Sequence, residues 1–134
     1  MTYTRTPDEE ETVAANARTP RVIDWTTGDS YLQILGGAPE TCGMRSGRVE
    51  LARGEEIGEH STGDHEETLV VLEGAGEVHV AGHDVMPIRG GQSVYIPPQS
   101  THNVRNPASP LLRYVYVVAP VRTGAMPMHH ARST

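Results

Sequence analysis

Short apolar runs separated by turn-forming residues make up most of the chain after Arg21. Gly, Pro, Asp and Asn stand between these runs, and no stretch sustains the period of about 3.6 residues that marks an amphipathic helix. The pattern is typical of an all-β sandwich or barrel. The predicted strands are Val22–Trp25, Tyr31–Leu35, Arg48–Ala52, Glu67–Leu72, Glu77–Val80, Ser93–Ile96, His102–Arg105 and Leu111–Val118.

The first twenty residues have a different character. They are charged and poor in large apolar side chains, so they bury too little surface to offset the entropy of ordering them. We therefore expect a polar leader over residues 1–20 that is mobile or weakly packed. One β-barrel domain follows over residues 21–120, and a tail covers residues 121–134. A short helix over Pro7–Ala17 is an alternative for the leader, because Pro and acidic residues suit a first helical turn.

Two predicted strands are apolar on both faces. Alternate residues of a strand point to opposite faces, so if Glu67 points inward, Leu69 and Val71 do so too. The residues between them are also mostly apolar, and Leu111–Val118 shows the same two-sided character. Both faces of such a sheet need cover. We expect a second sheet on one face, and a partner subunit or the chain's own N-terminal strands on the other.

Charge and composition exclude several classes of function. The formal net charge is -6, with eleven basic residues that are all arginine. This balance argues against a nucleic-acid partner, and the absence of lysine excludes Schiff-base chemistry. No apolar run approaches the roughly 20 residues that cross a bilayer. A single cysteine, Cys42, fits a reducing compartment, so the expectation is a soluble cytoplasmic protein with no membrane partner.

Metal-ligand residue types recur at fixed spacings in two segments of the chain. The segment from Gly54 to Gly74 reads G-x5-H followed by E-x6-G, and it supplies His60 and Glu67. The segment from Gly91 to Asn106 reads G-x5-P-x4-H-x3-N, and it supplies His102. Neutral imidazole and carboxylate together suit Zn, Fe, Mn, Ni or Cu.

The paired motifs resemble the two signature motifs of the cupin superfamily. The resemblance covers about residues 54–106, and it implies a single-domain double-stranded β-helix, or jelly-roll, barrel. It also implies that His60, Glu67 and His102 bind one divalent transition metal, and it points to a homodimer. Asn106 is expected to have a structural role, binding backbone groups where its strand ends.

The chain departs from the family pattern at two positions. Thr62 stands where the family usually has a second histidine, and Gln99 stands where it has a glycine. The identity of the fourth ligand is therefore undecided. His65 is a candidate because its spacing of two from Glu67 puts both side chains on one face of a strand, although a loop position near the barrel mouth is the competing interpretation. Thr62 could instead bind a metal-bound water. The candidate metal ligands are thus His60, His65, Glu67 and His102.

Two classes of function follow from the resemblance. The first is a metal-dependent enzyme of the dioxygenase, isomerase or epimerase, lyase or decarboxylase type, acting on a small polar metabolite inside the barrel. The second is a non-catalytic small-molecule-binding or sensing module with a structural metal or none. In either case the pocket is mainly aliphatic because the chain has no Phe. Its candidate polar groups are Tyr95, Tyr114, Tyr116 and Arg113, half of which must point away by strand parity.

Overall fold

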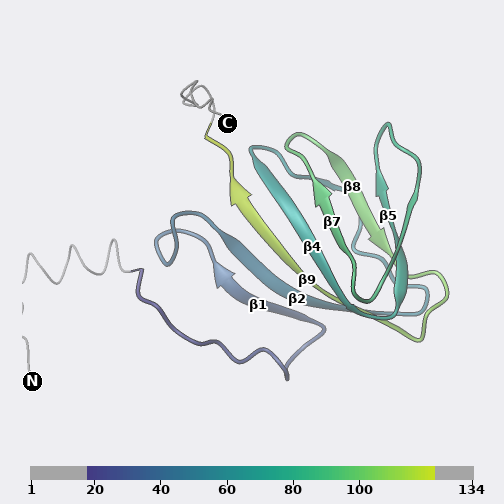
Figure 1. The fold of residues 1–134 in the computed structure, drawn as a ribbon, viewed down its shortest axis with the longest axis horizontal. Helices are drawn as coiled ribbons and strands as arrows, with labels where there is room; N and C mark the ends of the chain where they lie inside the picture. The colour runs from purple at the N-terminus through teal and green to yellow at the C-terminus, as the bar shows by residue number, and fades with distance from the viewer. Residues whose placement is uncertain (1–17, 123–134) are drawn as a thin grey trace, which may run out of the picture.

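The computed structural model describes residues 18–122, and the regular elements of this part of the chain are β-strands (Figure 1). None of the described residues belongs to a helix long and apolar enough to span a membrane. The leader helix considered for residues 7–17 lies outside the described residues. The strands are β1 (Tyr31–Gly36), β2 (Arg45–Ala52), β3 (His60–Ser61), β4 (His65–Glu73), β5 (Ala75–Val80), β6 (Met86–Arg89), β7 (Ser93–Ile96), β8 (Thr101–Arg105) and β9 (Leu111–Pro120).

The strands form two antiparallel sheets that share one core. The larger sheet has the order β1-β2-β9-β4-β7, and the smaller sheet has the order β3-β8-β5-β6. Figure 1 shows β1 and β2 on one side of the molecule and β8 and β5 on the other. Buried aliphatic side chains from both sheets form a single cluster, so the sheets face each other. The expectation of an all-β protein is confirmed.

Seven of the eight predicted strands are present, and the strand predicted at Val22–Trp25 is wrong. That segment has no strand partner among the described residues, and Val22 is 98% exposed. It is held instead by Arg48, a buried residue of β2 whose guanidinium donates hydrogen bonds to the carbonyls of Trp25 and Asp29. Two strands were missed: β3 has only two residues, and β6 contains Pro87, so neither shows a readable alternation.

Strand parity in β4 follows the sequence prediction. Glu67, Leu69 and Val71 are buried, whereas Val70 and Leu72 are exposed. The second sheet covers the inner face. On the outer face, Trp25 of the N-terminal segment shares the lining of a shallow cavity of about 210 Å³ with Leu72. The N-terminal strand β1 does not cover this face but extends the sheet beside β2. The homodimer stays a prediction.

Two motif residues owe their identity to backbone contacts. Gly74 has a φ of +84°, and a Cβ there would lie 1.8 Å from the carbonyl oxygen of Leu111, so any side chain would force the strands apart. Asn106 is fully buried, and its amide donates to the carbonyls of Leu51 and Ser109 at 2.8 and 3.0 Å. Its side-chain oxygen accepts from the Ser109 N–H at 2.9 Å. The structural role predicted for Asn106 is confirmed.

Gln99 keeps the turn that a glycine forms in the family pattern. Its φ is +56°, which is the left-handed region that side chains disfavour. Its N–H donates to the Gly63 carbonyl at 2.9 Å, and its side-chain amide donates to Asp64 at 3.0 Å. The loop before β8 is therefore preserved at a cost in backbone energy.

Replacing Gln99 with Gly should raise the free energy of unfolding by about 0.5 kcal/mol. The left-handed conformation costs a residue with a side chain about 1–2 kcal/mol, and this gain exceeds the extra chain entropy of glycine, about 0.5–1 kcal/mol. Urea unfolding measures the change. Gln99→Ala is the control, because it removes the exposed hydrogen bond and keeps the strain. A Gly variant no more stable than the Ala variant would contradict this account.

Candidate metal centre

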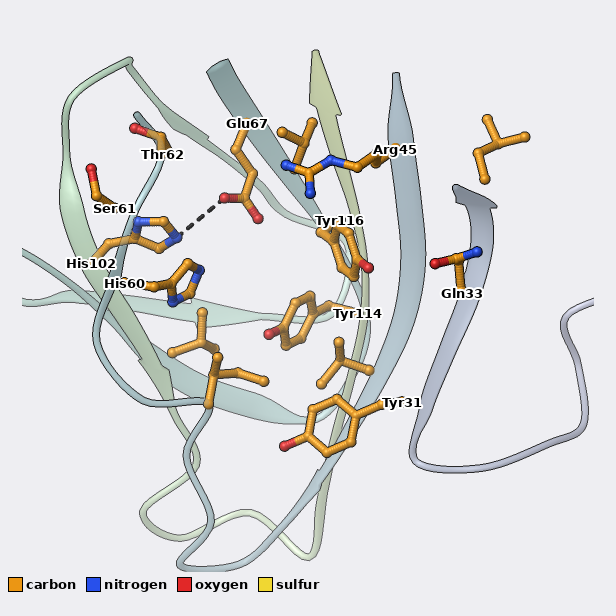
Figure 2. A pocket seen from close by; sticks show the side chains of 15 residues that line it. Tyr31, Gln33, Arg45, His60, Ser61, Thr62, Glu67, His102, Tyr114 and Tyr116 are labelled. Carbon is orange, nitrogen blue, oxygen red and sulfur yellow. Dashed lines mark ion pairs between the residues drawn. The ribbon is translucent and has the colours of Figure 1, made fainter. Parts of the chain in front are cut away.

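Three side chains from separate strands converge inside the barrel. His60 comes from β3, Glu67 from β4 and His102 from β8 (Figure 2). One ligand atom from each lies within 4.8 Å of the other two. Two nitrogen ligands at 2.0–2.1 Å from one ion are at most about 4.2 Å apart, so small side-chain rotations bring all three atoms onto a single metal. The convergence expected from the motif spacing is present.

Sheet pairing explains why these residues meet. His60 and His102 are directly opposite each other in the β3–β8 ladder, and their ring centroids are 4.2 Å apart. Glu67 lies on the other sheet, and its parity in β4 turns it inward with Leu69 and Val71. The site therefore consists of one cross-strand histidine pair and one carboxylate from the facing sheet.

Both imidazoles are oriented by backbone carbonyls. Nδ1 of His60 is 3.0 Å from the Gly58 carbonyl, and Nδ1 of His102 is 3.1 Å from the Ser100 carbonyl. A carbonyl only accepts, so each Nδ1 carries the hydrogen and donates it. In the neutral rings each Nε2 is then left with a free lone pair. This is the tautomer and the outer hydrogen bond that metal-ligating histidines have.

Glu67 and His102 form a buried polar pair. Nε2 of His102 is 3.2 Å from Oε1 of Glu67, and the two residues are only 2% and 8% exposed. A neutral Nε2 and a carboxylate are both acceptors, so a positive charge must sit between them. Burial lowers the pKa of His102, but the hydrogen bond to Glu67, with help from the Ser100 carbonyl, outweighs it and leaves the pKa above its ordinary value. A proton and a metal ion therefore compete for the same lone pair.

This competition predicts opposite pH trends for metal affinity and for the stability of the metal-free protein. The raised pKa means that the His102–Glu67 ion pair stabilises the fold fully below about pH 6.5, and that this contribution is lost as pH rises through the folded-state pKa of His102. Zinc affinity should rise over the same range, by up to about tenfold per pH unit, because binding releases the proton.

Zinc titration and urea unfolding of the metal-free protein between about pH 6 and 8.5 measure the two trends. Glu67→Gln is the control, because it removes the charged partner and leaves burial opposed only by the Ser100 carbonyl, so the pKa of His102 should fall. The stability loss with rising pH should then disappear. Zinc affinity independent of pH would rule out a displaced proton.

His65 and Thr62 do not join the group. His65 is half-buried on the same strand as Glu67, but two residues of strand displace it by about 6.6 Å, and it does not line the cavity. The Thr62 hydroxyl donates to the Pro97 carbonyl at 2.8 Å and accepts from the Ser100 N–H at 3.0 Å. Thr62 thus fixes the loop before His102. Among the described residues the structure gathers three candidate ligands.

Histidine variants should distinguish His60, which belongs to the group of candidate ligands, from His65, which does not. His60→Ala should weaken zinc binding by more than about 100-fold, since even outer hydrogen-bond partners of a metal ligand are worth 10–100-fold. His65→Ala should change zinc affinity by less than about twofold. Competition with a chelating dye measures both constants. A loss of similar size in the two variants would place His65 among the ligands.

A cavity of about 340 Å³ extends from the triad along the inner face of the larger sheet. Tyr114 and Tyr116 line it, as parity allowed, whereas Tyr95 and Arg113 point away. The Tyr95 hydroxyl donates to Glu66 at 2.8 Å, and Arg113 pairs with two surface carboxylates. Arg113 is therefore not available to bind a substrate.

Sequence reasoning missed the polar residues that β1 and β2 contribute to the cavity wall. Tyr31 and Gln33 come from β1, and Arg45 begins β2 (Figure 2). The alternation in Tyr31-Leu32-Gln33 was the available signal, because residues two apart share a face. Nothing in the sequence shows, however, that β1 pairs with β2 and so extends the wall of the cavity.

Two antiparallel sheets that enclose a cavity with candidate metal ligands define a small barrel of the double-stranded β-helix class. A model of the Cupin domain family matches residues 47–118, which is more than half of the chain. The chain therefore belongs to the cupin family. No curated protein sequence matches it significantly.

Solved structures show the same fold. An RmlC-like cupin family protein from Methanocaldococcus jannaschii, described as having a double-stranded β-helix fold, is similar at 18% identity and a TM-score of 0.65. The match covers 75% of this chain and 91% of that one. A Cupin 2 conserved barrel domain protein from Salinispora arenicola is 20% identical, with 89% of each chain covered and a TM-score of 0.58. A predicted oxalate decarboxylase from Thermotoga maritima is 17% identical, with 75% and 100% covered and a TM-score of 0.58. These likenesses confirm the jelly-roll fold.

Proposed function

We propose that this cupin is a metal-dependent enzyme that acts on a small polar metabolite held in the barrel. The observation that carries the proposal is the convergence of two oriented imidazoles and one buried carboxylate at the wall of a cavity. Three protein ligands leave coordination positions open, and open positions are what catalytic metal sites have. Two histidines and one carboxylate are also the donor set of non-haem iron oxygenases.

The residues present fit a transition metal better than a hard cation. Calcium and magnesium favour sites built from oxygen, whereas two of these three donors are imidazole nitrogens that accept zinc, iron, manganese, nickel or copper. Glu67 is buried, so a cation beside it would offset the cost of removing its charge from water. A bound metal would polarise a substrate oxygen or activate water or O2.

The protein's own groups would orient the substrate. Figure 2 shows the Tyr114 hydroxyl directed into the cavity, on the side of His60. Burial, and then the charge of Glu67, raises the pKa of Tyr114 far above its ordinary value. Its phenol therefore stays protonated, so it can donate a hydrogen bond to a substrate oxygen but does not serve as a base. Val49, Val104 and Ile57 supply apolar walls that exclude water.

Metal analysis of protein without a polyhistidine tag tests the proposal. After reconstitution with each candidate ion, the wild-type chain should hold about one ion, and Glu67→Gln should lose affinity by more than about 100-fold. Glu77→Gln is a matched control, because Glu77 makes a similar contact with His79, at 3.0 Å, in a pair outside the site. The control variant should bind metal like the wild type.

Equal effects of the two Glu→Gln variants would mean that the ligands are assigned wrongly. A wild-type chain that takes up none of these ions would favour the non-catalytic binding module. A loaded chain that binds metabolites without converting any of them would favour that module with a structural metal.

A further inference from the structure

Arg45 is a cation on the cavity wall that has no partner among the described residues. Arg21, Arg105 and Arg113 form ion pairs with carboxylates, and Arg48 binds carbonyl oxygens. Arg45 lines the cavity, and its guanidinium makes no hydrogen bond or ion pair with any described residue. A guanidinium offers five donors, so it is available to a bound molecule.

The register of the larger sheet places Arg45 relative to the metal ligands. Arg45 is directly opposite Val118, and Val118 is directly opposite Glu67. Residues opposite each other in an antiparallel sheet point to the same face, so the cation and the carboxylate both face the cavity. Two strand spacings of about 4.8 Å separate their backbones. No ion pair joins them among the described residues, and both line the cavity.

The neighbouring row of the sheet adds neutral polar groups beside Arg45. Gln33 is opposite Gly47, and Gly47 is opposite Tyr116. A Cβ at Gly47 would lie 2.6 Å from the Tyr116 hydroxyl, so the absence of a side chain lets the phenol lie across β2 toward Gln33 (Figure 2). Neither polar group forms a side-chain hydrogen bond with a described residue. The guanidinium of Arg45, the amide of Gln33 and the phenol of Tyr116 therefore line one wall of the cavity. None of the three forms a side-chain hydrogen bond with a described residue.

We propose that the cavity binds a small organic carboxylate whose acid group is held by Arg45, with Gln33 and Tyr116 as neutral partners. The rest of the molecule then extends toward His60, Glu67 and His102. A single guanidinium balances a single carboxylate and matches its two oxygens in shape. A cavity of about 340 Å³ lies at the small end of ligand sites. The inference that the other end of the molecule faces a metal rests on the proposed function. Binding of the acid group by Arg45 does not require a metal.

Binding of propionate and butyrate to metal-free protein tests this assignment, with propionamide and butyramide as uncharged counterparts. Calorimetry or NMR titration should show that at least one carboxylate binds, and about tenfold or more tightly than its amide. Arg45→Gln should remove that difference. Arg89→Gln is the matched control, because Arg89 is exposed on β6 and does not line the cavity, and it should bind as the wild type does.

Zinc affinity of Arg45→Gln is the second readout. Removing a cation from the cavity should leave zinc affinity unchanged or raise it, whereas a misfolded barrel would lose both ligands. Arg45→Lys keeps the charge and should recover part of the carboxylate binding. Equal binding of propionate or butyrate to wild type and Arg45→Gln, no carboxylate binding at all, or loss of zinc in Arg45→Gln would overturn the assignment. Wild-type protein that binds carboxylate but no transition metal would instead contradict only the proposed function.

Discussion

The placement of a buried carboxylate opposite a pair of imidazoles inside a barrel is the constraint on which the site depends. Glu67 and His102 are buried, and their facing atoms are both acceptors when the imidazole is neutral. Such a pair is stable only with a cation between its members, either a proton or a metal ion. The backbone carbonyls at Gly58 and Ser100 fix the other nitrogen of each ring. The fold thus directs the lone pairs of the two Nε2 atoms and of the Glu67 carboxylate toward one point.

The two sheets contribute different things to this arrangement. The smaller sheet supplies both histidines as one cross-strand pair, whereas the larger sheet supplies the carboxylate and the wall of the cavity. The two charged side chains that the larger sheet directs into the cavity, Arg45 and Glu67, lie in the same row of register partners. The proposed carboxylate site and one of the candidate metal ligands therefore share a single face of the larger sheet. They are separated by the width of one intervening strand, β9.

The candidate metal ligands could be predicted from the sequence, but the full cavity could not. Fixed spacings identified His60, Glu67 and His102, because loop lengths in this fold are constrained by turns such as the one at Gly74. Parity within β4 correctly placed Leu69 and Val71, since alternation is a local property. Arg45 and Gln33 were missed because strand pairing is not local. His65 satisfied the parity rule, yet the rise along the strand moves it away from the other ligands.

The strand that carries His60 has only two residues, and His60 is exposed while the other two ligands are buried. Glu67 and His102 stand on longer strands within the packed core. The three residues therefore differ in exposure, with Glu67 and His102 inside the packed core and His60 at its solvent-facing edge. A metal ion held by these three residues would be shielded from solvent on the side of Glu67 and His102 and accessible to solvent on the side of His60.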